Sequence, residues 1–247
     1  MKEYNQIKIW HSPFRNGTNW TADFTALAWH ITHDCNKMCP FCQIRIEESD
    51  YQGITWADYY TVLANIGDPS SIRLWELAGG EPILHPFFHD LVRSLRHDYP
   101  NAEIRVLSNA HRKTFLDLTS EIWDLCTWRV THYPGWNDWI LEWGQEKDNI
   151  ELIRLPDGEL YNPFVDPDYS EAFARNIRDG CWFLATLKGS NLYSCHLAEV
   201  QERIHGLESL HVRFDRNWKE KWLGLVNITW KACAHCYEAE RRVRMGG

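Results

Sequence analysis

The sequence predicts an α/β protein: a parallel sheet with right-handed crossovers, open or curled towards a barrel, followed by a small C-terminal domain that carries cysteines. Three observations support this prediction. Strand-like and helix-like patterns alternate over about residues 23–155, a turn-rich stretch then ends the alternation, and all but one of the 8 cysteines fall into a group of three and a group of four. Alternating strands and helices are typical of βαβ units, whose strands pair in parallel.

The first βα unit spans residues 23–67. Residues 23–32 are rich in β-forming side chains and lead into a cysteine-rich loop, which indicates a buried strand. The apolar residues of the next segment recur at helical spacing: Trp56, Tyr59, Tyr60, Leu63 and Ile66. Thr55 and Asp58 form a capping-box pattern at the start of this helix, and Gly67 marks its end.

The alternation continues to about residue 155. Further strands are predicted over 71–78, 103–109, 127–133 and 149–155, and further helices over 87–99, 112–126 and 138–144. The stretch "LPDGELYNPFVDPD" then has Pro, Gly and Asp at turn frequency, which indicates a boundary. We therefore expect one domain over 1–165 and a second over 166–247, with a helix over 169–179.

Composition narrows the functional classes. The chain has 247 residues, of which 44% are hydrophobic and 24% charged, as in ordinary globular proteins. Its net charge of −8 argues against nucleic acid as the main partner. Because the N-terminus lacks an apolar signal segment and no window reaches a membrane span, we expect a cytoplasmic protein without a membrane anchor. In that compartment, clustered cysteines indicate metal binding rather than disulfides.

The sequence "CNKMCPFC" places Cys35, Cys39 and Cys42 at the spacing C-x3-C-x2-C. Three thiolates without a nearby fourth can hold a four-iron cluster and leave one iron open. An open coordination position distinguishes a reactive metal site from a structural one. The alternative is a structural zinc site that these cysteines complete with a neighbour such as His33.

A second motif, "GGEP", follows the strand predicted over 71–78. Glycines at a strand end let the backbone approach a ligand closely, and the following carboxylate can receive an ammonium group. The candidate ligand-binding residues are therefore Gly79, Gly80 and Glu81. An incidental turn between a strand and a helix is the alternative interpretation.

Together these motifs resemble the radical S-adenosylmethionine (radical SAM) superfamily, over about residues 24–155. Its cysteine signature is C-x3-C-x-aromatic-C, with Phe41 in the aromatic position. The resemblance implies a partial (βα)6-type parallel barrel and a [4Fe-4S] cluster that binds S-adenosylmethionine (SAM) at its open iron. It also implies an electron donor such as flavodoxin or ferredoxin, cleavage of SAM to a 5′-deoxyadenosyl radical, and abstraction of a substrate hydrogen.

The same resemblance assigns site residues. Gly79, Gly80 and Glu81 would receive the methionyl amine of SAM. Asn109 and Thr131, at later strand ends, lie where the family often places polar groups on the SAM carboxylate and ribose. Loop capping is the alternative role for Asn109 and Thr131.

Four further cysteines form a second group, Cys181, Cys195, Cys233 and Cys236. The first two flank a predicted hairpin with Gly189 near its turn, and the last two form "CAHC". Four thiolates can close a metal site with no open position. Zinc is an alternative to iron, and a histidine such as His196 or His235 can replace one thiolate.

This second group resembles the twitch extension, the shortened form of the SPASM extension of radical SAM enzymes, which carries an auxiliary [4Fe-4S] cluster. Five residues separate Gly189 from Cys195, where the family usually shows four. The resemblance thus implies two [4Fe-4S] clusters and SAM as cofactors. A non-catalytic zinc-binding interaction scaffold is the alternative for the whole chain. The leftover Cys126 lies at the end of an apolar helix face and is predicted to be a buried structural thiol.

Substrate residues are predicted from strand alternation. In a curled parallel sheet, Glu76 and Tyr133 share a face with Ala78 and Thr131, and Arg154 follows on a later strand. Glu76, Tyr133 and Arg154 are the substrate-side candidates, with structural polar roles as the alternative. The resemblance implies an oxidoreductase-type enzyme. The substrate would be a peptide or a small molecule, with oxidation or cross-linking of a peptide side chain or dehydrogenation of a sugar or aminocyclitol.

Overall fold

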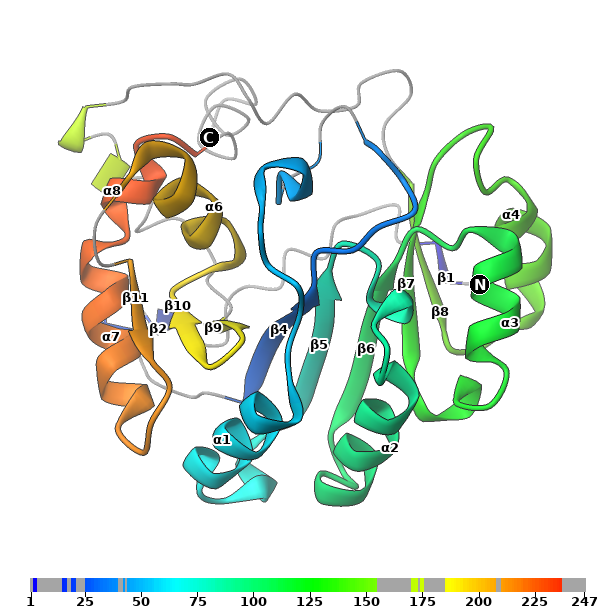
Figure 1. Cartoon of the computed structure of the whole chain (residues 1–247), viewed down its shortest axis with the longest axis horizontal. Coiled ribbons are helices and arrows are strands. Elements are labelled where there is room, and N and C mark those ends of the chain that lie inside the picture. Colours follow the sequence, from blue (N-terminus) through cyan, green and yellow to red (C-terminus); the bar gives the residue numbers. More distant parts are fainter. Residues whose placement is uncertain are drawn as a thin grey trace.

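The computed structural model describes residues 2–3, 15–16, 19–20, 25–39, 42, 44–154, 170–172, 174–175, 185–207 and 210–236. Nine strands form one sheet in the order β1-β8-β7-β6-β5-β4-β9-β10-β11 (Figure 1). In this order, neighbouring strands from β1 through β4 to β9 pair in parallel. The pairs β9–β10 and β10–β11 are antiparallel. The α/β class predicted from the sequence is confirmed, and the mostly parallel sheet is consistent with a partial barrel.

The elements have the following bounds. The strands are β1 (Lys2–Glu3), β2 (Arg15–Asn16), β3 (Asn19–Trp20), β4 (Ala26–Thr32), β5 (Leu74–Gly79), β6 (Glu103–Ser108), β7 (Thr127–His132), β8 (Ile150–Arg154), β9 (Ala185–Lys188), β10 (Asn191–Tyr193) and β11 (His211–Arg213). The α-helices are α1 (Trp56–Ile66), α2 (Phe88–Asp98), α3 (Arg112–Thr119), α4 (Trp139–Trp143), α6 (His196–His205), α7 (Trp218–Ile228) and α8 (Trp230–Cys233). The 3-10 helices are η1 (Ile46–Glu48), η2 (Pro69–Ser71), η3 (Pro82–Leu84), η4 (Trp123–Leu125) and η5 (Gly144–Glu146).

Local sequence signals set the ends of α1. The Thr55 hydroxyl accepts a hydrogen bond from the Asp58 backbone N–H (3.2 Å), and the Asp58 carboxylate accepts one from the Thr55 N–H (2.9 Å). This is the predicted capping box, which satisfies two N–H groups that a helix start leaves without partners. Gly67 ends the helix with φ of 84°, a conformation that favours glycine.

Most elements differ from their predicted bounds by one to three residues at an end, and two differences are informative. The predicted helix over 112–126 is divided into α3 and η4 by a turn at residues 120–122. At the last residue of α3, the Thr119 hydroxyl donates a hydrogen bond to the Phe115 carbonyl (2.6 Å). The strand predicted over 71–78 begins at Leu74, since Asp68 caps the 3-10 turn η2 through the Ser70 N–H (2.9 Å).

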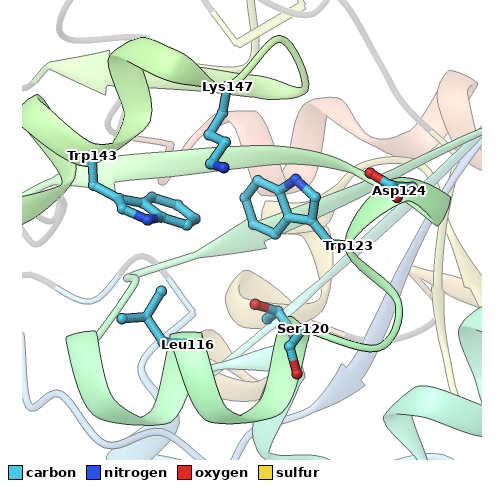
Figure 2. Close-up of a pocket in the computed structure, with 7 residues that line it drawn as sticks. Leu116, Ser120, Trp123, Asp124, Trp143 and Lys147 are labelled. Carbon is cyan, nitrogen blue, oxygen red and sulfur yellow. The ribbon is translucent and has the colours of Figure 1, made fainter.

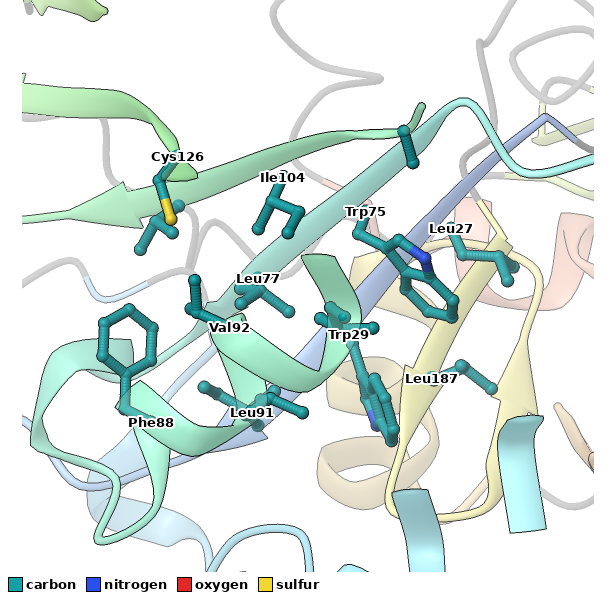
Figure 3. Packing of buried hydrophobic residues seen from close by; sticks show 14 of the residues in the cluster. Leu27, Trp29, Trp75, Leu77, Phe88, Leu91, Val92, Ile104, Cys126 and Leu187 are labelled. Atoms are coloured by element: carbon teal, nitrogen blue, oxygen red, sulfur yellow. The ribbon is translucent and has the colours of Figure 1, made fainter. Parts of the chain in front are cut away.

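The outer face of the sheet carries the main core. Trp29 on β4 and Trp75 on β5 are fully buried and lie against the apolar faces of α1 and α2. Figure 3 shows this packing, with Leu91 and Val92 of α2 directed at the strands. Cys126 belongs to the same cluster and is 4% exposed, which confirms the predicted buried thiol.

The C-terminal segment extends the sheet. Strand β9 pairs in parallel with β4, and β9 and β10 form a hairpin whose turn contains Gly189 (φ 57°), as predicted. Leu187 of β9 and Trp218 of α7 belong to the same buried cluster as Trp29. The predicted boundary at 165/166 lies outside the described residues. None of the described helices is both long and apolar enough to cross a membrane.

Candidate active site

The predicted site residues follow neighbouring parallel strands. The cysteine loop leaves β4, "GGEP" leaves β5, Asn109 follows β6, and Thr131 lies near the end of β7. The carboxyl ends of parallel strands meet at one edge of a sheet, where open and barrel α/β folds bind their ligands. The fold therefore brings these segments together.

Gly79 and Gly80 make room for the cysteine loop itself. A Cβ atom on Gly79 would lie 2.0 Å from the Thr32 carbonyl oxygen, and one on Gly80 would lie 2.2 Å from that of Asp34. The Gly80 N–H donates to the Thr32 carbonyl (2.8 Å), and the Glu81 N–H donates to the Asp34 carbonyl (2.7 Å). The observed close approach is between two segments of the chain, and the predicted approach of a ligand to this backbone stays a prediction.

Glu81 is completely buried. Its Oε2 accepts a hydrogen bond from the Asn109 backbone N–H (2.7 Å). The Ser108 side chain and the Ile83 N–H also lie close enough to lower the pKa of the carboxyl, but no described donor makes a hydrogen bond of good geometry to Oε1. Burial raises the pKa of this carboxyl to about 7. Glu81 thus fixes the end of β6, and its second oxygen is the kind of buried acceptor that an ammonium group can satisfy.

Asn109 connects β6 to the cysteine loop. Its Nδ2 donates to the Asn36 Oδ1 (2.8 Å) and lies 3.6 Å from the Cys35 sulfur, within hydrogen-bond reach of a thiol. The next residue, Ala110, has φ of 45°, which is unusual for a residue other than glycine. Strained backbone of this kind often accompanies functional sites.

Sequence reasoning missed Asn137, a fully buried residue that joins the ends of β6 and β7. Its Nδ2 donates to the carbonyls of Asn109 and Thr131 (both 2.8 Å), and its Oδ1 accepts from the Tyr133 N–H (2.8 Å). The available signal was an Asn just after the Pro-Gly turn that follows β7, since Asn often bonds nearby backbone in turns. Asn137 therefore orders the β7 side of the site.

The three cysteines of the loop are free thiols of intermediate exposure. The pKa of Cys35 is raised to about 11, chiefly by burial and in smaller part by the charges of Glu81, Cys39 and Cys42. The Tyr133 side chain hydrogen-bonds Cys39. Among the described residues, no three His, Cys, Asp or Glu side chains are placed around one metal ion. Three neighbouring free thiols nevertheless form the donor set that iron–sulfur clusters require, and the buried Glu81 Oε1 beside them fits an amine-bearing cofactor.

The C-terminal cysteines lie around α6 and α8. Cys195 is the N-cap residue of α6 and packs in one small apolar cluster with Cys236 and Leu197. Cys233 is the last residue of α8 and packs beside Ala174. The Cys236 N–H donates a hydrogen bond to the Cys233 carbonyl (3.2 Å). Cys181, the fourth predicted ligand, lies outside the described residues.

The two histidines considered as replacement ligands flank this region. His196 follows Cys195, and burial lowers its pKa to about 4. His235, between Cys233 and Cys236, stacks on His205 with ring centroids 4.1 Å apart. A neutral imidazole is the form that binds metals, so the low pKa of His196 is compatible with such a role.

The substrate-side candidates have different surroundings. Glu76 lies in an ion-pair network on the inner face of the sheet, 3.5 Å from Arg105 and 3.3 Å from Arg129. Each of these partners is a cation, as a largely buried carboxylate requires, so both the substrate-side role and the structural alternative stay predictions. Tyr133 lies beside Cys39, and the Lys37 ammonium stacks over its ring (4.7 Å). Phe41 and the side chain of Arg154 lie outside the described part of the structure.

A pocket of about 260 Å³ lies away from these residues (Figure 2). It is formed by α3, η4 and the segment around η5, and its lining includes Leu116, Ser120, Trp123 and Trp143. None of the predicted site residues contributes to it, so we assign the candidate site to the strand ends instead.

Comparison with known proteins identifies the fold. The structure of BtrN in complex with AdoMet and 2-DOIA matches 86% of this chain and 92% of its own, with 14% identity and a TM-score of 0.62. BtrN in an open conformation matches 88% of each chain, with 13% identity and a TM-score of 0.55. BtrN is a radical SAM enzyme. The fold expected from the sequence motifs is therefore confirmed.

One curated protein shares a short region of sequence. A probable GTP 3′,8-cyclase of Sulfolobus acidocaldarius is 35% identical over 66 residues, which are 27% of this chain and about a fifth (21%) of that protein. No family model matches the chain. The comparisons thus do not confirm the twitch or SPASM extension.

Proposed function

We propose that this chain is a radical SAM enzyme whose first [4Fe-4S] cluster is held by Cys35, Cys39 and Cys42. The observation that carries the proposal is the hydrogen-bonded meeting of the cysteine loop with the two other motif segments. Glu81 joins the loop through Asp34, and Asn109 reaches Asn36 and Cys35. This arrangement occurs at the carboxyl edge of a sheet with the BtrN fold.

The chain's own residues would hold and orient SAM. The resemblance gives Gly79, Gly80 and Glu81 the methionyl amine, and the buried Glu81 Oε1 is suited to accept such a donor. Asn109 and Thr131 are proposed for the carboxylate and ribose, with Phe41 beside the cluster. The cluster and SAM together supply reductive cleavage of SAM and abstraction of a substrate hydrogen.

We propose a second [4Fe-4S] cluster on Cys181, Cys195, Cys233 and Cys236. The packing of Cys195 against Cys236 supports this assignment for two of the ligands. Four thiolates leave no open iron, so this cluster would exchange electrons rather than bind SAM. Flavodoxin or ferredoxin is the proposed donor to the first cluster.

The substrate is proposed to be a small polar molecule that undergoes dehydrogenation. The inner face of the sheet carries Glu76, Arg105, Arg129 and Glu151 in one ion-pair network, which suits hydroxyl or amino groups better than apolar ones. The BtrN structure with AdoMet also contains 2-DOIA. A peptide substrate is the other outcome of the test.

The test is anaerobic reconstitution followed by assays with SAM and dithionite. We expect about eight irons per chain and formation of 5′-deoxyadenosine. Small hydroxylated amines and sugars, and in parallel short peptides, are then screened for SAM-dependent oxidation. A content of about four irons per chain would contradict the proposed second cluster. Stoichiometric zinc in a colourless protein would support the zinc-binding scaffold and overturn the proposal.

A further inference from the structure

Helix α6 contacts the backbone that follows the cysteine loop. The Arg203 guanidinium donates to the carbonyl of Ile44 (2.7 Å) and reaches that of Arg45 (3.4 Å). These carbonyls lie two and three residues after Cys42, whereas Arg203 lies more than 150 residues further along the chain. Arg203, a side chain of the C-terminal segment, thus binds the backbone that directly follows the cysteine loop.

A buried carboxylate orients Arg203. Glu199 is only 3% exposed, and its Oε1 lies 3.1 Å from the Arg203 Nε and 2.5 Å from the Lys188 Nζ. The guanidinium is a rigid planar fork. Because its Nε edge is fixed on Glu199, its terminal nitrogens point towards the loop carbonyls.

The end of the same loop is tied to the β9–β10 hairpin. The Tyr51 hydroxyl donates to the His30 carbonyl (3.1 Å) and accepts from the Gly189 N–H (2.9 Å). The Lys188 ammonium lies over the Tyr51 ring at 4.9 Å. Residues 44–51 are therefore held at one end by α6 and at the other by the hairpin that precedes it.

The contact with Arg203 coincides with an unfavourable backbone conformation. Arg45 has φ of 44°, in the left-handed region that residues other than glycine rarely adopt. Such a conformation persists only where surrounding contacts stabilise it. The hydrogen bonds from Arg203 to the carbonyls of Ile44 and Arg45 are contacts of this kind.

From these contacts we infer that Arg203 is a positioning residue for the first cluster: it fixes the backbone after Cys42 and so makes the geometry of the reactive cysteine loop depend on α6. The N-cap residue of helix α6 is Cys195, a proposed ligand of the second cluster. The functional consequence rests on the proposed function, because it assumes a cluster in each region. Arg203 would then couple the position of the first cluster to that of the second. The contacts themselves are observed in the structure and do not rest on the proposed function.

The test compares Arg203→Lys with Arg96→Lys. Lysine keeps the charge beside Glu199 but lacks the fork that reaches two carbonyls. Arg96 is the matched control, since it also donates to backbone carbonyls (Pro100, Ala102 and Leu125) but lies on α2. Hydrogen exchange of the metal-free proteins is measured first. We expect about tenfold faster exchange in residues 44–51 for Arg203→Lys only.

The reconstituted variants are measured next. We expect Arg203→Lys to lose at least half of the SAM-responsive EPR signal after dithionite reduction, while Arg96→Lys resembles the parent. Unchanged exchange over 44–51 in Arg203→Lys, or faster exchange with a parental SAM-responsive signal, would overturn the inference. A parent that binds no iron would instead overturn the proposed function, while the exchange data would still show whether Arg203 holds the loop.

Discussion

The cysteines after β4 and those of the C-terminal segment are held in different ways. Cys35, Cys39 and Cys42 have intermediate exposure and lie among polar groups, including the Asn109 amide and the Tyr133 side chain. Cys233 and Cys236 are buried and Cys195 has intermediate exposure, but all three pack with apolar neighbours. Partial exposure and polar surroundings suit a site that exchanges ligands, whereas burial suits a closed one.

The largest expected effect separates these two groups. Replacing Cys35, Cys39 and Cys42 by Ala should abolish cleavage of SAM with dithionite, because they supply every protein ligand of the proposed reactive cluster. Cys233→Ala/Cys236→Ala should retain some 5′-deoxyadenosine formation but lose substrate conversion. Both products are measured together, with circular dichroism as the check on folding.

Two outcomes would break the comparison. Persistent formation of 5′-deoxyadenosine in the variant that lacks Cys35, Cys39 and Cys42 would contradict their assignment as ligands of the reactive cluster. Substrate conversion at the parent rate in folded Cys233→Ala/Cys236→Ala would show that the C-terminal thiols have neither an electron-transfer nor a structural role.

Gly79→Ala should have the next largest effect. Its φ is 135°, and the added Cβ would lie 2.0 Å from the Thr32 carbonyl oxygen, so the cysteine loop must move. We expect a loss of about 3 kcal/mol in the free energy of unfolding and poor iron loading of the first cluster. Gly224→Ala is the matched control, because nothing lies within 4 Å of its Cβ position. Equal stability of the two variants in urea titrations would contradict this view of "GGEP".

A smaller effect concerns His30, which lies between the two regions. Burial lowers its pKa well below the ordinary 6.5, and the charges of His33 and His196 add to this. The folded state therefore keeps His30 neutral, and its contribution to stability is lost as the pH falls below 6.5. For the metal-free protein, the change from pH 7 to 5.5 should cost about 1 kcal/mol less in His30→Gln than in the parent. The free energies of unfolding come from urea titrations of both proteins at both pH values, and an equal loss in parent and variant would refute this.

The smallest effect is expected for Cys126, which lies in the main core (Figure 3). Burial raises its pKa to about 12, so it stays a neutral thiol at ordinary pH. Cys126→Ala should leave iron content and SAM cleavage unchanged and lower stability by about 1 kcal/mol through lost packing. A loss of iron in this variant would show that the division of the cysteines into three and four is wrong.

Signals close together in sequence predicted most of the barrel. The Thr55–Asp58 capping box and Gly67 set both ends of α1, and strand periodicity located β4 to β8. Each of these elements depends mainly on its own residues. The division of 112–126 into two helices was missed, because the turn at residues 120–122 contains neither Gly nor Pro to mark it in the sequence.

Contacts between residues far apart in the sequence could not be predicted from such local signals. The motif residues of the candidate site were found by spacing, but Asn137 and Arg203 were not, since their roles depend on carbonyls that only the folded sheet brings near. Likewise, "GGEP" predicted a close approach without revealing that the approaching group is the chain itself. Such contacts form only when folding brings distant segments of the chain together.

The pairing of β9 with β4 also determines the order in which this chain can fold. Strand β4 leaves the ribosome early, but its partner on one side lies at residues 185–188, and the Trp29 indole bonds to the Gly189 carbonyl across 160 positions. Until that segment is synthesised, one edge of β4 has no strand beside it. Contacts this distant form slowly, and an uncovered strand edge can pair with another chain. Truncation before β9 should therefore yield an aggregating polypeptide rather than a smaller barrel.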